Sequence, residues 1–75
     1  MSRVKIREGQ KGFYDQHGNK KSALLEEGQS LKIKRVKADQ YICSVVNPSP
    51  LCKAYGGYEG MLVVAYEEHL EIKDE

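Results

Sequence analysis

The sequence predicts one small all-β domain whose sheet is closed or strongly bent. Several segments alternate apolar and polar residues with the period of two that a half-buried strand requires. Polar turn residues separate them, and only residues 22–27 are helix-like, a stretch too short to be stable alone. Because a short open sheet would expose unpaired backbone groups at its edges, we expect the strands to form a small barrel.

Five segments are expected to form strands. Residues 4–7 (VKIR) are apolar on one face and basic on the other, and residues 31–34 (LKIK) repeat this pattern. The short polar break at residues 37–40 predicts a hairpin. A single helical turn is expected at 66–69, and the longest break, 47–60, contains both prolines. In chain order, the expected strands are residues 4–7, 31–36, 41–46, 61–65 and 70–72.

Length and composition indicate a single non-enzymatic domain over residues 1–75. The 40 % of apolar residues is enough for one compact core, but so short a chain has little material for a catalytic cleft. No segment approaches the roughly 20 apolar residues that span a bilayer, and the amino terminus lacks the apolar run of a secretory signal. We therefore expect a cytoplasmic protein without membrane association.

The cysteines and histidines form no recognised chemical motif. Cys43 and Cys52 are too few for a disulfide framework or a thiolate zinc site, and we expect reduced thiols, although their spacing would permit one bridge across a hairpin. His17 and His69 show no ligand spacing and are expected to be solvated turn residues. We expect no catalytic residue, metal, cofactor or small-molecule substrate.

Charge is divided unevenly along the chain. Residues 1–37 contain ten of the twelve Lys and Arg residues and have a net charge of +6, whereas residues 38–75 have a net charge of −5. This division predicts either a dipolar surface suited to an anionic partner or two halves that neutralise each other across a sheet.

Four segments resemble the sequence pattern of SH3 domains. Residues 12–15 (GFYD) resemble the opening ALYD segment, and residues 23–33 (ALLEEGQSLKI) look like the ELSFKKGERLQI pattern of the diverging turn and second strand. Residues 40–43 (QYIC) fall where SH3 domains carry Trp-Trp-x-Ala, and residues 63–70 are similar to the closing strands and their 3₁₀ turn. The resemblance covers residues 12–72.

This resemblance implies a five-stranded SH3-like barrel with a long distal loop, formed by an insertion near residues 47–60. Gly28 would lie in a turn that benefits from positive φ. The side chains expected to face inward together are those of Leu25, Leu31, Ile33, Cys43, Val64 and Leu70.

The peptide groove of SH3 domains is not retained. That groove uses aromatic side chains and a proline to bind polyproline II ligands. Of those positions only Tyr14 is kept, whereas Gln16, Gln40 and Ala65 stand where the second tyrosine, the tryptophan and the proline would be. Replacing the tryptophan removes most of the apolar contact area, so we do not expect binding of PxxP peptides.

The segment 47–60 is the first candidate site. Tyr55 and Tyr58 flank two glycines and offer large amphipathic rings, which are favoured at protein interfaces. A loop this long in a small domain is often functional. The alternative is an extended hairpin whose tyrosines pack back on the barrel.

A basic face is the second candidate. Its lysines and arginine could track a phosphate backbone, but Tyr14 is the only clear aromatic residue among them, and a pI near 7.8 is modest for a nucleic-acid-binding domain. The alternative is a solvated lysine face. The residues of this candidate are Lys5, Arg7, Lys20, Lys21, Lys32 and Lys34.

Taken together, the sequence predicts a small binding module or regulator that acts through protein–protein contact. Domains of this size are common among bacterial and phage accessory proteins. Nucleic-acid binding through the basic face is the alternative, because SH3-like barrels also occur in ribosomal and transcription proteins. The expected partner-binding residues are Tyr14, Tyr55, Tyr58, Tyr66, Glu67 and Glu68.

Overall fold

The computed structural model of the protein describes residues 3–18 and 20–72, which form a mostly β fold with one short α-helix. This confirms the predicted predominance of strands. The elements are β1 (Arg3–Ile6), β2 (Gly12–Asp15), β3 (Ser22–Leu25), β4 (Ser30–Lys37), β5 (Gln40–Val45), α1 (Pro50–Ala54), β6 (Leu62–Tyr66), the 3₁₀ turn η1 (Glu67–His69) and β7 (Leu70–Ile72).

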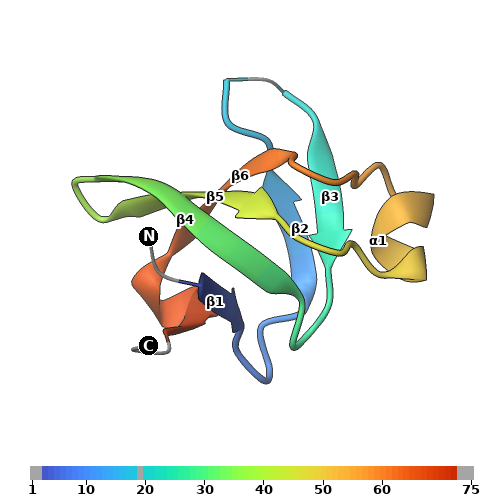
Figure 1. Ribbon diagram of the computed structural model, residues 1–75, viewed down its shortest axis with the longest axis horizontal. Helices are drawn as coiled ribbons and strands as arrows, with labels where there is room; N and C mark the ends of the chain where they lie inside the picture. Colours follow the sequence, from blue (N-terminus) through green and yellow to red (C-terminus); the bar gives the residue numbers. More distant parts are fainter. Residues whose placement is uncertain (1–2, 19, 73–75) are drawn as a thin grey trace.

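The strands form two antiparallel sheets. The larger has the order β6-β5-β4-β1-β7, and the smaller is the β2–β3 hairpin, which lies on the same side of the molecule as α1 (Figure 1). The hairpin meets the edge strand β6 through a bridge between Gln16 and Val63, where the His17 N–H donates to the Leu62 carbonyl at 2.9 Å. The first strand, β1, pairs with both β4 and β7.

All five expected strands are present, as are the hairpin at residues 37–40 and the turn after Tyr66. The helix-like interpretation of residues 22–27 is wrong, because Ser22–Leu25 pairs with β2 as strand β3. Hydrogen bonding to β2 and burial of Ala23 and Leu25 outweigh the local helical preference of this stretch.

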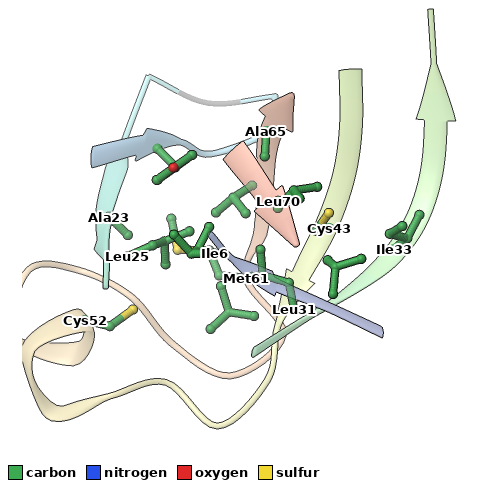
Figure 2. Close-up of a cluster of buried hydrophobic side chains, with 14 residues drawn as sticks. Ile6, Ala23, Leu25, Leu31, Ile33, Cys43, Cys52, Met61, Ala65 and Leu70 are labelled. Carbon is green, nitrogen blue, oxygen red and sulfur yellow. The ribbon is translucent and has the colours of Figure 1, made fainter. Parts of the chain in front are cut away.

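The core fills the space between the two sheets. Inward side chains alternate along the strands, for example Leu31 and Ile33 on β4, and Figure 2 shows the cluster extending from Cys52 on α1 to Ile33. The prediction that Val64 faces inward is wrong, because its neighbours Val63 and Ala65 are fully buried and Val64 is on the opposite face. In a strand, a shift of one residue exchanges the two faces.

Candidate functional site

The segment 47–60 is more ordered than the long loop expected from the sequence, because it contains α1. Ser49 caps this helix, since its hydroxyl accepts a hydrogen bond from the Cys52 N–H at 3.1 Å. Pro50 occupies the first turn, where its missing N–H leaves no intrahelical bond unmade. At the other end, the Gly57 N–H donates to the Cys52 carbonyl at 2.7 Å.

A buried glutamine fastens the beginning of this segment. The side chain of Gln29, 5 % exposed, donates to the Val46 carbonyl at 2.8 Å and accepts from the Ser49 N–H at 3.1 Å. The far end is also held, because the Gly60 N–H donates to the Val45 carbonyl at 2.9 Å. The tyrosines that follow α1 therefore lie in a segment that is hydrogen-bonded to the rest of the fold at both ends.

Close packing between Cys52 and Gly57 fixes the middle of the segment. A Cβ atom at Gly57 would overlap the Cys52 sulfur and lie 2.9 Å from the Cys52 carbonyl oxygen. Cys52 and Cys43 are free thiols, both buried. Burial raises the pKa of Cys43 to about 11, and burial together with the nearby Glu26 raises the pKa of Cys52. Neither thiol is an activated nucleophile at neutral pH.

Three exposed aromatic side chains lie on or beside the segment 47–60. Tyr55 and Tyr58 belong to the segment and Phe13 to strand β2, and we call these three residues the aromatic surface. Their exposed fractions are 62 %, 51 % and 52 %. Phe13 and Tyr55 meet edge to face with ring centroids 5.9 Å apart. The Tyr58 hydroxyl accepts a hydrogen bond from Gln16 Nε2 at 2.7 Å, which connects the segment to the end of the β2–β3 hairpin.

Two members of this surface, Tyr55 and Tyr58, were predicted from the sequence as partner-binding residues, and Phe13 was not. Tyr55 and Tyr58 are exposed, as expected of interface residues. Tyr14 is not available for contact, because it is only 7 % exposed and its hydroxyl donates to the Gln10 carbonyl at 2.7 Å. The alternation within β2 turns Phe13 outward because Tyr14 turns inward, but the sequence of two adjacent aromatic residues did not indicate which of them is exposed.

Tyr66, Glu67 and Glu68 belong to a different part of the molecule. Tyr66 ends β6, roughly 13 Å along the strand from Leu62, where the hairpin adjoins it. There the Tyr66 ring meets His69 edge to face at 5.8 Å, and Glu67 and Glu68 are exposed on η1. These three predicted interface residues therefore do not extend the aromatic surface.

The basic face is divided as well. Arg3 lies opposite Lys32 on adjacent strands, and Lys5 lies on the same face of β1 as Arg3. Lys34 occupies the irregularity in β4 where the pairing register shifts. The other three predicted members lie elsewhere: Lys20 and Lys21 are in the β2–β3 connection, and Arg7 lines a hollow with the two glutamates of η1.

Little direct ion pairing neutralises the basic face. Within residues 3–18 and 20–72, the only Lys/Arg–carboxylate contact within 4 Å joins Lys5 Nζ to Glu71 Oε2 at 3.9 Å. Strand β4 lies between β1, which carries Arg3 and Lys5, and β5, which has no charged residue. Of the two alternatives for the uneven charge, neutralisation of the two halves across the sheet is therefore represented by one ion pair among the described residues.

Two hollows lie on either side of Tyr58. One, of about 580 Å³, is lined by Gln16, Lys21, Ser22, Gly56, Tyr58 and Met61. The other, of about 520 Å³, is lined by Asn47, Pro48, Lys53, Gly57, Tyr58 and Glu59. The described residues contain no cluster of three side chains that could hold a metal ion. This arrangement offers contact area and hydrogen-bond donors.

Comparisons with known proteins give no relative: no family model, no curated protein and no solved structure matches the chain. Among the residues that the structure describes, no helix has the length and apolar character needed to cross a membrane.

Proposed function

We propose that this protein is a small, non-enzymatic binding module that contacts a protein partner through the aromatic surface. The observation that carries the proposal is the exposure of three aromatic side chains, each about half exposed or more, on two supports that are in contact: Tyr55 and Tyr58 on the anchored segment 47–60, and Phe13 on β2, where its ring meets Tyr55. Large rings that are already held in place lose little conformational freedom on binding, and they dominate the energetics of many protein interfaces.

We further propose that the fold is an SH3-like barrel. The order β6-β5-β4-β1-β7, in which the first strand lies between β4 and the last strand, supports this relationship, as does the 3₁₀ turn before β7. Of the positions that would form an SH3 peptide groove, Tyr14 and Ala65 are buried here, whereas Gln16 contacts the aromatic surface through its hydrogen bond to Tyr58. A cytoplasmic location belongs to the proposal, and the free thiols of Cys43 and Cys52 are compatible with it.

The proposal is tested by affinity capture from a bacterial lysate treated with nuclease. The wild-type protein is expected to retain a discrete protein, and the double variant Tyr55→Ala, Tyr58→Ala is expected to lose it. Val36→Ala is the matched control, because Val36 is 54 % exposed but lies on the β4–β5 hairpin. Circular dichroism checks that each variant is folded. A partner retained equally by the double variant would contradict the proposal.

Nucleic-acid binding by the basic face is the second candidate. The observation in its favour is the row Arg3, Lys5 and Lys32, in which only Lys5 has an acidic partner in the described part of the chain. Such a site would bind phosphates with an affinity that falls steeply with added salt. The variant Lys32→Glu, Lys34→Glu should abolish this binding, and salt-independent binding unaffected by the charge reversal would rule it out.

A further inference from the structure

The larger hollow beside Tyr58 has walls from two separate parts of the chain, and both are fixed. On one side, the Gln16 N–H donates to the Lys21 carbonyl at 2.8 Å within the β2–β3 connection. On the other, Gly56 adopts a φ of +95° and packs beside the Ser22 backbone, where a Cβ atom would lie 3.4 Å from the Ser22 carbonyl oxygen, an ordinary van der Waals distance. These contacts bring the two walls of the hollow together within the fold of the chain itself.

The lining of this hollow is rich in hydrogen-bond donors and has no carboxylate. The Tyr58 hydroxyl accepts from Gln16, so its own proton is free to be donated. Lys21 is exposed and has no carboxylate within 4 Å in the described part of the chain, and Ser22 is also exposed. Met61, 1 % exposed, belongs to the buried core beneath the hollow and offers a partner almost no accessible surface.

The smaller hollow has a different chemistry. It contains Lys53 but also Glu59, whose Oε1 accepts a hydrogen bond from the Asn47 N–H at 3.0 Å. A fixed carboxylate in this position disfavours a second negative charge. Only the hollow with Lys21 therefore combines a cation and neutral donors without an acid in its lining.

We propose that the hollow lined by Lys21, Ser22 and Tyr58 receives an aspartate or glutamate side chain of the protein partner while the aromatic surface covers an adjacent apolar segment. This inference rests on the proposed function and names the chemistry of the partner. Hydrogen bonds between charged groups are about twice as strong as those between neutral groups, so the carboxylate would fix the register of the partner on the surface.

A single carboxylate fits the charge around the hollow better than a phosphate backbone does. Asp15 lies directly opposite Ser22 across the β2–β3 pair and is exposed. Its negative charge opposes any anion in the hollow, and it opposes a chain of phosphates, which brings several negative charges, more than a single carboxylate that Lys21 can neutralise.

The test uses a phage-displayed library of random peptides selected on the immobilised full-length protein. One selected peptide is then synthesised with its acidic residue and with the corresponding amide, Gln or Asn. Affinities are measured by calorimetry for the wild type and for Lys21→Gln, Tyr58→Phe and Lys20→Gln. Lys20 is the matched control, because it is an exposed neighbouring lysine that does not line the hollow.

We expect the selected peptides to share an acidic position. Lys21→Gln should weaken the acidic peptide about tenfold and the amide peptide less than twofold, since only the first loses a charged hydrogen bond. Tyr58→Phe should act in the same direction with a smaller effect, and Lys20→Gln should change neither affinity by more than about twofold.

Three results would overturn the inference, and they are distinguishable. Peptides that need Phe13 and Tyr55 but are indifferent to Lys21→Gln would overturn the carboxylate site and leave the proposed function standing. A library that gives no binder sensitive to Phe13→Ala or Tyr55→Ala would overturn both. A single-stranded 20-nucleotide DNA that binds through Lys21 and displaces the peptide would assign the hollow to nucleic-acid phosphate.

Discussion

Two ends of the molecule expose apolar side chains on very different supports. At one end, Tyr55 and Tyr58 follow a helix that is fastened by Gln29 and packed through Cys52. At the other, the β4–β5 hairpin projects from the sheet, and residues 34–39 are all exposed (Figure 1). The segment that looks like a loop in the sequence has buried anchoring contacts, whereas the tip of the regular hairpin has none among its own side chains. We therefore expect substitutions at the two ends to change the free energy of unfolding by different amounts.

The largest effect is expected for Gly57→Ala. The added methyl group would overlap the Cys52 sulfur and press on the backbone of α1, so the segment must move. We expect the free energy of unfolding to fall by about 3 kcal/mol, measured by urea denaturation. Gly12→Ala is the control, because a Cβ atom at Gly12 meets nothing within 4 Å, and its effect should stay within about 0.5 kcal/mol. Equal effects would show that the tyrosine end is not packed as described.

Gln29→Leu should have the next largest effect. It removes the acceptor of the Ser49 N–H and the donor to the Val46 carbonyl, leaving both groups without this partner at the base of the segment. The expected loss is about 2 kcal/mol, with faster amide exchange at Ser49. Gln40→Leu should be nearly neutral, because the Gln40 side chain makes a single 3.4 Å bond to Tyr66 on the surface. Unchanged exchange at Ser49 would contradict the role given to Gln29.

The core between the two ends makes a pH-dependent contribution. Burial raises the pKa of Cys43 from 9.0 to about 11, so the folded state binds this proton more tightly than the unfolded state. The contribution is fully present below pH 9 and is lost as the pH rises towards 11, on the order of 1 kcal/mol. Because tyrosines and lysines also titrate in this range, the measurement is the difference between wild type and Cys43→Ala. A constant difference between pH 8 and 11 would refute this assignment.

The smallest effect is expected at the projecting hairpin, where Ala38 has a φ of +54°. A residue with a side chain is strained in this conformation, and glycine is not. Ala38→Gly should therefore raise the free energy of unfolding by about 0.5 kcal/mol, measured by thermal denaturation. Asp39→Gly should give no gain, because Asp39 does not have a positive φ. A loss of stability in Ala38→Gly would mean that the turn is not strained.

The sequence was informative where apolar and polar residues alternate. Strands β1 and β4 could be found with their inward faces, because each apolar residue has a lysine or arginine beside it. Residues 61–65 are continuously apolar, so their period gives no face, and Val64 was assigned to the core in place of its neighbours. Phe13 and Tyr14 present the same difficulty, since two adjacent aromatic residues do not indicate which one turns outward.

Elements that depend on distant partners could not be found locally. Residues 22–25 are a strand only because β2 pairs with them. Helix α1 has five residues, too few for a periodic pattern, and its only sequence signals were the Ser49 cap and Pro50. The candidate hollow joins residues 16–22 to residues 56–61, and that juxtaposition is a property of the tertiary fold.

The pairing of β1 with β7 determines how the molecule responds to a pulling force. Val4 is the cross-strand partner of Ile72, so the described chain enters and leaves at the same end of one antiparallel pair. Tension between these two points acts across the strands, and the hydrogen bonds of the pair break one after another instead of together. We therefore expect the protein to unfold at low force, beginning with the separation of β1 from β7. Figure 1 shows β1 on the opposite side of the molecule from α1, so an attachment made through the β1–β7 pair would lie away from the helix that precedes Tyr55.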